Sequence, residues 1–194
     1  CLVEDEIDLG VTVLDMGGTG PNLIDGIVRR GAGLNVACLY IMVPGSTIAD
    51  ADPSPSALSD IVGNALRQGC LGLKVLGGYR PFTPETTANI IRACNERMAY
   101  VAYHVGTTES GSHLGGLREV PELVGGGRLH VAHINSYCRG VIEEANAECD
   151  EALSILEGMR GQLNSEAYHA VPNGTSGRCD DDGNVVADVP RNCL

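Results

Sequence analysis

Apolar segments alternate with segments of helical pattern at a nearly constant interval along this chain of 194 residues. Strands are predicted where apolar and β-branched residues cluster, at residues 11–16, 36–43, 71–76, 100–104, 129–134 and 163–168. The centres of these segments lie about 30 residues apart, which is the length of one strand-plus-helix unit. Because the strands are apolar on both faces, we expect a parallel sheet covered by helices.

The intervening segments carry the signals of helices. Residues 54–68 repeat apolar side chains at helical spacing. Thr83-Pro84-Glu85 supplies a capping hydroxyl, a proline for the first helical position and an acid for the first turn, and the helix that begins there is expected to reach about Met98. Further helices are predicted at residues 22–30, 119–124 and 149–159.

Two architectures accommodate this alternation, an open doubly wound sheet and a (β/α)8 barrel. A complete barrel needs eight units and about 200–250 residues, whereas only six strands are predicted. Glycine-rich segments such as 17–20 and 77–78 follow strands, where the active-site loops of a barrel belong. We therefore expect an α/β fold of the (β/α)8 TIM-barrel type, with residues 1–194 forming one incomplete catalytic-barrel domain of about strands 2 to 7.

The composition excludes several classes of partner. With 25 acidic and 13 basic residues the formal net charge is −12, which opposes non-specific binding to nucleic acid or to anionic membranes. No apolar run approaches the roughly 18–20 residues that cross a bilayer. The eight cysteines form no C-x-x-C pair and several lie inside apolar runs, which favours reduced thiols in a cytoplasmic protein over a disulfide framework.

Several common catalytic motifs fail on spacing. The glycines of segment 17–20 follow a strand, but the third glycine of a dinucleotide-binding turn is replaced by Leu23. Segment 109–113 contains serines and a histidine without the G-x-S-x-G elbow of a serine hydrolase. Segment 180–184 resembles part of a calcium loop but lacks the distal glutamate, so a solvated loop is expected there.

Three chemically capable side chains lie at or near the carboxyl ends of consecutive predicted strands: Lys74, His104 and His133. In a parallel barrel these ends converge on the active site. A lysine inside an apolar strand is costly unless it has a role, and its ammonium would repel a divalent cation beside two imidazoles. If the amine reacts with CO2, the resulting carbamate can bridge two metal ions about 3.5–4 Å apart. A salt-bridged lysine, a Schiff-base lysine and ordinary core histidines are the alternatives.

Four segments around these residues resemble one known group of enzymes. They are GVTVLDM at 10–16, GLKVLGGY at 72–79, AYHV at 102–105 and HVAHINS at 130–136. In this order they resemble the metal-dependent amidohydrolase superfamily, in the branch that holds hydantoinases, dihydroorotases and N-acyl-D-amino-acid deacylases.

The resemblance implies roles for individual residues. Lys74 would be the carboxylated bridging lysine, and His104 and His133 would bind the more exposed of one or two divalent ions, zinc above all. A bridging hydroxide would attack an amide or cyclic-amide carbonyl of a small molecule, and Tyr79 would donate a hydrogen bond to the developing oxyanion. The family's His-x-His and its strand-eight aspartate have no counterpart here, since residues 180–182 follow the seventh strand.

Substrate-binding residues are also expected near these strand ends. Arg139 follows the sixth strand and could hold a substrate carboxylate, while Asn135 and His113 lie in neighbouring segments. His130 is expected to point away from the site, on the strand face opposite to that of His133, and His169 is a candidate neighbour of the metal site. The full-length protein is expected to form a homo-oligomer. A non-catalytic barrel serving as an oligomerisation scaffold and a Schiff-base enzyme stay open as alternatives.

Overall fold

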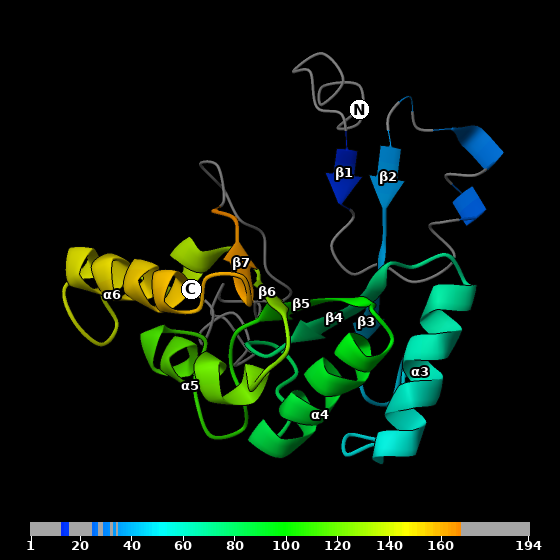
Figure 1. The fold of residues 1–194 in the computed structure, drawn as a ribbon, viewed down its shortest axis with the longest axis horizontal. Helices are drawn as coiled ribbons and strands as arrows, with labels where there is room; N and C mark the ends of the chain where they lie inside the picture. Colours follow the sequence, from blue (N-terminus) through cyan, green and yellow to red (C-terminus); the bar gives the residue numbers. More distant parts are fainter. Residues whose placement is uncertain (1–12, 16–24, 27–28, 32, 34, 168–194) are drawn as a thin grey trace, which may run out of the picture.

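The computed structural model describes residues 13–15, 25–26, 29–31, 33 and 35–167 (Figure 1). The strands in chain order are β1 (Val13–Asp15), β2 (Asn35–Ala37), β3 (Leu39–Met42), β4 (Gly72–Leu76), β5 (Tyr100–His104), β6 (Leu129–Val131) and β7 (Leu163–Ser165). The helices are α3 (Pro55–Arg67), α4 (Pro84–Glu96), α5 (Leu114–Val124) and α6 (Ala145–Gly158), with the short 3-10 helix η1 (Ile134–Tyr137) after β6. Among the described residues, no helix combines the length and apolarity needed to cross a membrane.

Five strands form one parallel sheet in the order β3-β4-β5-β6-β7, which is also their order along the chain. Helices α3, α4 and α5 lie along one side of this sheet (Figure 1). Successive strand-helix-strand units of this kind are the repeating element of a TIM barrel. Within the described residues the sheet is open, with β3 and β7 as its edges. The predicted α/β class with a parallel barrel-type sheet is therefore confirmed.

The segment predicted as one strand at residues 36–43 is two strands. β2 pairs with β1, with Val13 opposite Asn35, whereas β3 pairs with β4, with Leu39 opposite Gly72. The partner changes at Cys38, whose carbonyl accepts a hydrogen bond from the amide of Leu71 at 2.9 Å. The single-strand prediction was wrong because an unbroken apolar run carries no sign of a change of partner.

Helices α3 and α4, which pack on the sheet, each begin with a side-chain cap. The Ser54 hydroxyl accepts a hydrogen bond from the Ala57 amide at 3.3 Å, and the Thr83 hydroxyl accepts one from the Thr86 amide at 3.1 Å. A proline follows each cap, as predicted for the helix that begins after Thr83. Helix α5 begins five residues earlier than predicted, because Nδ1 of His113 accepts from the Gly115 amide at 3.0 Å and so caps it.

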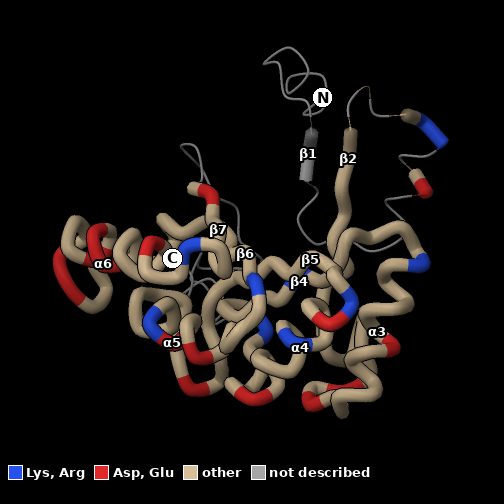
Figure 2. Tube along the Cα trace, in the orientation of Figure 1, with Lys and Arg blue, Asp and Glu red and all other residues tan. Residues whose placement is uncertain are grey.

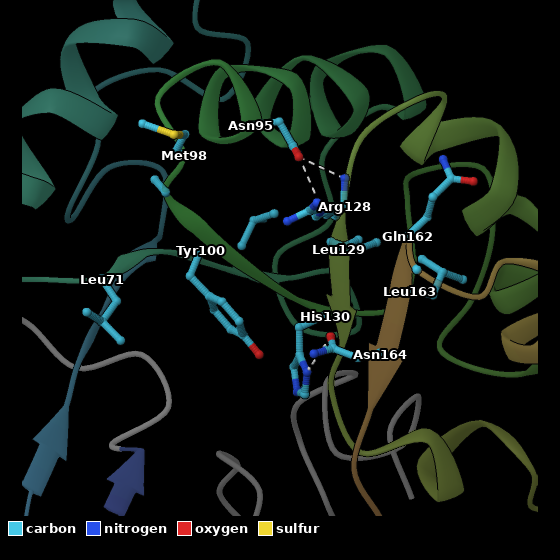
Figure 3. A pocket seen from close by; sticks show the side chains of 13 residues that line it. Leu71, Asn95, Met98, Tyr100, Arg128, Leu129, His130, Gln162, Leu163 and Asn164 are labelled. Atoms are coloured by element: carbon cyan, nitrogen blue, oxygen red, sulfur yellow. Dashed lines mark hydrogen bonds between the residues drawn. The ribbon is translucent and has the colours of Figure 1, made fainter.

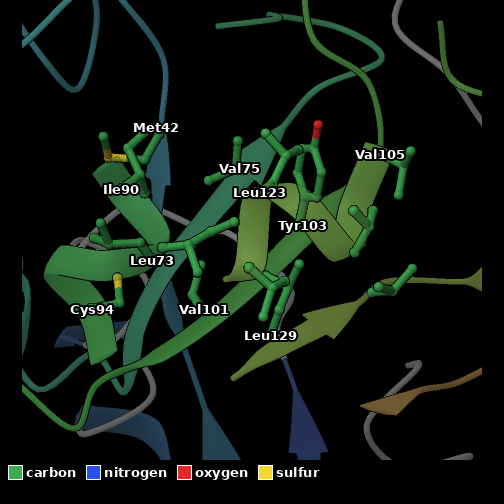
Figure 4. Packing of buried hydrophobic residues seen from close by; sticks show 14 of the residues in the cluster. Met42, Leu73, Val75, Ile90, Cys94, Val101, Tyr103, Val105, Leu123 and Leu129 are labelled. Atoms are coloured by element: carbon green, nitrogen blue, oxygen red, sulfur yellow. The ribbon is translucent and has the colours of Figure 1, made fainter. Parts of the chain in front are cut away.

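The hydrophobic core lies between the helices and one face of the sheet (Figure 4). Leu73 and Val75 of β4 and Val101 and Tyr103 of β5 point into this core and are almost fully buried. Because successive side chains of a strand alternate between faces, Lys74 and His104 belong to the opposite face. Lys74 is the only Lys, Arg, Asp or Glu within β3–β7, and Figure 2 shows the other charges along the helices and loops. The sheet therefore has one apolar face and one that carries functional groups.

Candidate functional site

The register of the sheet places Lys74 on the same face as the histidines. Lys74 pairs with Ala102, Ala102 with His130, and His130 with Asn164, so these four residues form one row across the sheet. His104 belongs to the next row toward the carboxyl ends, opposite Leu76. Lys74 is only 6% exposed and is the single lysine of the whole chain. Its burial on this face is the first sign of a specialised site.

His104 and His133 contact each other directly. Nδ1 of His104 lies 2.6 Å from Nε2 of His133, and both side chains are buried. The predicted strand at 129–134 ends at Val131, and His133 adopts a left-handed backbone conformation with φ of 42°. This turn brings the His133 ring into contact with the ring of His104, which belongs to the neighbouring strand β5. On its other side, Nε2 of His104 lies 2.8 Å from the hydroxyl of Ser112.

The environment keeps both imidazoles neutral. Burial, together with the neighbouring His133, Lys74 and Arg139, lowers the pKa of His104 to about 3. Burial likewise lowers the pKa of His133, where Glu166 opposes the shift and Lys74 adds to it. The charge of Lys74 contributes to the shift at both rings, in agreement with its register position one row from His104. Neutral imidazoles retain the lone pair that a metal ion needs.

The donor set suits a divalent metal after a small adjustment. The described residues contain no group of three or more His, Cys, Asp or Glu side chains placed to hold a metal ion, so the donors present are two imidazoles and Lys74. Zinc held about 2.0–2.1 Å from each of two nitrogens keeps those nitrogens about 3.3 Å apart. The observed 2.6 Å contact must therefore open by less than about 1 Å. Lys74 fits only without its positive charge, as a carbamate would.

Tyr79 also lies beside this pair. Its ring meets that of His104 edge-on, with the ring centres 4.9 Å apart, and its side chain is half-buried. The backbone between β4 and Tyr79 passes very close to His104, since a Cβ on Gly78 would lie 2.5 Å from Nε2 of that ring. The glycine thus permits the approach of Tyr79 to the histidines.

A hollow of about 500 Å³ opens at the carboxyl ends of β4 and β5, and its lining includes Gly78, Ser112, His113 and Arg139. Arg139 is exposed and donates a hydrogen bond to the Ser112 carbonyl at 3.2 Å. His113 reaches the same hollow, although its Nδ1 is engaged as the cap of α5. Asn135 is exposed in η1 and does not line this hollow. Two of the three expected substrate-binding residues thus lie together.

A second hollow, of about 860 Å³, lies at the amino ends of the same strands (Figure 3). Tyr100, His130 and Asn164 contribute to its wall. It is the larger of the two, and neither hollow is lined by Lys74, His104 or His133. The smaller hollow is lined by Ser112, whose hydroxyl contacts Nε2 of His104, and is therefore the candidate site.

His130 does not point away from His133 as expected. Both contact one carboxylate: Nε2 of His130 contacts Oε2 of Glu166, and the backbone amide of His133 donates to Oε1 at 2.7 Å. The expectation was wrong because the strand ends at Val131, so the alternation of faces does not extend to His133. Glu166 itself was missed, although a carboxylate just after β7 is the same kind of signal that singled out the histidines. His169 and residues 180–182 lie outside the described residues.

Known proteins resemble this chain in structure but not detectably in sequence. No family model matches the chain, and no curated protein matches its sequence. In structure it is similar to N-acyl-D-glutamate deacylase from Bordetella bronchiseptica, solved with zinc and a phosphonate inhibitor that mimics the tetrahedral intermediate. That match has a TM-score of 0.60 and 15% identity and covers 86% of this chain and 43% of the deacylase. An amidohydrolase from Burkholderia ambifaria with bound zinc gives a TM-score of 0.47 and 13% identity, covering 85% of this chain and 55% of that one.

The chain thus spans less than half the length of the deacylase. At this level of identity the likeness concerns the arrangement of the strands and helices. The described β/α units of this chain correspond to part of a TIM barrel.

Proposed function

We propose that the chain belongs to a metal-dependent amidohydrolase that cleaves the C–N bond of a small-molecule amide or cyclic amide. The observation that carries the proposal is the 2.6 Å contact between two buried, neutral imidazoles beside the only lysine of the chain. The arrangement of the strands, similar to that of a zinc-containing deacylase, supports it. His104 and His133 would hold a divalent ion, zinc above all, through the two nitrogens that face each other.

Lys74 would serve as the third metal-binding group after reaction with CO2. The neutral amine attacks the carbon of CO2, so that an N–C bond forms while one C–O π bond breaks; the nitrogen passes one proton to water, and an anionic carbamate results. The product removes the positive charge that otherwise opposes a cation at this place. It also supplies two oxygens on the face of the sheet that carries both histidines.

The other side chains of the site would act on the substrate. A bound divalent ion supplies the acidity that activates water and the charge that polarises a carbonyl. Tyr79, next to His104, would donate a hydrogen bond to the oxygen that becomes negative, an effect typically worth a few kcal/mol. Ser112 would keep His104 in place through its contact with Nε2.

The position of Arg139 favours substrates that carry a carboxylate. It is exposed at the hollow beside Ser112, where its guanidinium can form two parallel hydrogen bonds to such a group. An N-acyl amino acid combines an amide bond with a carboxylate in one small molecule. The structural relative is by its name a deacylase of N-acyl-D-glutamate, a compound of this class.

The single lysine makes the carbamate directly testable. The chain is equilibrated with 13C-labelled bicarbonate and zinc, and the carbamate signal is followed by 13C NMR together with zinc content by mass spectrometry. We expect one lysine carbamate signal and bound zinc in the unchanged chain. Both should be lost in Lys74→Ala and in the charge-preserving control Lys74→Arg. Unchanged zinc content in both variants would overturn the role of Lys74.

A Schiff-base enzyme is the second candidate, because a buried lysine beside neutral imidazoles also suits a free amine nucleophile. Borohydride trapping with a carbonyl compound separates the two. A stable adduct at Lys74 would favour the Schiff-base reaction, whereas bicarbonate-dependent zinc binding favours the hydrolase. A chain that neither binds zinc nor forms an adduct fits the non-catalytic scaffold.

A further inference from the structure

One carboxylate holds the turn that presents His133. Glu166 follows β7, and its Oε1 accepts a hydrogen bond from the His133 amide at 2.7 Å. The backbone carbonyl of the same residue accepts one from the Ile134 amide at 2.9 Å. Two consecutive amides of the turn after β6 are therefore bound by a single residue that directly follows β7.

This turn is one that needs such support. His133 has φ of 42°, in the left-handed region that residues other than glycine rarely adopt. An extended backbone at this position would continue the alternation of β6 and send the His133 ring in another direction. The hydrogen bonds from Glu166 favour the left-handed conformation, which directs Nε2 toward His104.

The same carboxylate lies beside the other nitrogen of the ring. Oε1 of Glu166 is 3.7 Å from Nδ1 of His133, while Nε2 faces His104. Histidines that bind metals usually present their second ring nitrogen to a carboxylate, a carbonyl or water, which fixes the orientation of the ring. Glu166 occupies this position for His133, as the Ser112 hydroxyl does for His104.

Glu166 is itself held in place. Its Oε2 contacts Nε2 of His130, and Nδ1 of His130 lies 3.1 Å from the side-chain oxygen of Asn164 (Figure 3). These contacts fix a side chain that is otherwise about half exposed, at 47%. A series of contacts from Asn164 through His130 and Glu166 to His133 therefore links the row of residues that contains Lys74 to the histidine pair.

We infer that Glu166 is a positioning residue of the metal site, which holds His133 in the orientation that binds the metal. This inference rests on the proposed function. It assigns Glu166 no contact with the metal or the substrate. Its effect is exerted through the backbone and Nδ1 of His133.

The test compares metal binding in the full chain with that of Glu166→Gln, with Glu157→Gln as a matched control. Glu157 is an exposed helix residue that contacts only Arg160 among the described ion pairs. Zinc affinity is measured by competition with a chelating dye, and the visible spectrum of the cobalt(II)-loaded chain reports the ligand geometry. We expect Glu166→Gln to weaken zinc binding about 10–100-fold and to change the cobalt spectrum. Glu157→Gln should change neither.

Two further variants keep the test decisive. Glu166→Asp retains the carboxylate and should recover part of the affinity lost in Glu166→Gln. If Glu166→Gln does not fold, His130→Asn takes its place, because it leaves Glu166 present but removes the ring that holds it. Unchanged affinity and spectrum in the folded variant would overturn the inference alone. An unchanged chain that binds neither zinc nor cobalt would overturn the proposed function, and the inference with it.

Discussion

At the scale of single residues, Glu148 shows how a buried charge can organise a loop. It lies in the first turn of α6 and is fully buried. Its carboxylate accepts hydrogen bonds from the backbone amides of Gly140 at 2.7 Å, Ile142 at 2.7 Å and Glu143 at 3.0 Å. These bonds close the loop that directly follows Arg139. Three otherwise unpaired amides and one buried charge are thereby satisfied together.

Replacing Glu148 by Gln should destabilise the fold by about 1–3 kcal/mol, because the amide cannot accept from all three backbone groups. Urea denaturation followed by circular dichroism measures the change. Glu144→Gln is the matched control, since Glu144 makes no capping bond with its side chain. Equal stability of the two variants would contradict the role of Glu148.

The stabilisation contributed by Glu148 should also depend on pH. Burial alone would raise the pKa of Glu148, but the amides of Glu143, Ile142 and Gly140 outweigh it, and the net shift is downward from 4.5. A lowered folded-state pKa stabilises the fold fully above the unfolded-state pKa, and this stabilisation is lost as the pH falls through the folded-state pKa. The difference in stability between the unchanged chain and Glu148→Gln should therefore shrink below about pH 4.5.

The placement of side chains within strands could be predicted from the sequence, whereas contacts between residues far apart in the chain could not. Lys74 and His104 lie within strands, so alternation alone places them on one face. Glu166 and Ser112 gain their roles from contacts with His133 and His104; the position of Glu166 just after a strand marks it as a candidate, but its partner is not evident from the sequence. The left-handed turn at His133 likewise has no glycine or asparagine to announce it.

At the scale of elements, the carboxyl ends of β4 and β5 are joined by backbone at close range. The Gly77 amide donates to the His104 carbonyl at 2.8 Å. A Cβ on Gly77 would lie 2.1 Å from the Gly106 carbonyl oxygen and 2.5 Å from that of His104. Both of these are backbone atoms, which cannot turn aside as a flexible side chain can.

The variant Gly77→Ala should therefore force the two strands apart where His104 ends β5. We expect a loss of about 1–3 kcal/mol in the free energy of unfolding. Gly126→Ala is the control, because nothing lies within 4 Å of a Cβ there, and its stability should change by less than about 0.5 kcal/mol. Thermal unfolding of both variants provides the comparison, and a tolerated Gly77→Ala would refute the close approach.

Helix starts with conventional caps were predicted closely, and those with unusual caps were not. The starts of α3 and α4 follow from Ser54 and Thr83, each with a proline behind it. Helix α5 is capped by His113 and contains Pro121, two features that favour neither its start nor its continuation. The break between β2 and β3 depends on which strands lie nearby, so only the assembled sheet determines it.

At the scale of the whole molecule, a metal ion would link the end of β5 to the turn after β6, where His104 and His133 contact each other. Zinc bound to His104 and His133 should add about 2.7 kcal/mol to the stability at a free concentration 100 times its Kd. For a chain of this length that corresponds to a rise in Tm of about 5–10 °C. Scanning calorimetry with zinc, and again with excess chelator, measures the shift. His104→Ala should show none, and a zinc effect that survives in this variant would place the ion elsewhere.

The single, buried lysine also determines how the molecule reacts with amine-modifying reagents. Acid anhydrides and succinimidyl esters, which decorate the exterior of most proteins, find here no exterior ε-amine, because Lys74 is 6% exposed. Apart from the chain's α-amine, such a reagent must reach the buried face of the sheet before it can react. The rate of acylation at this one position therefore records how often that face admits a small molecule.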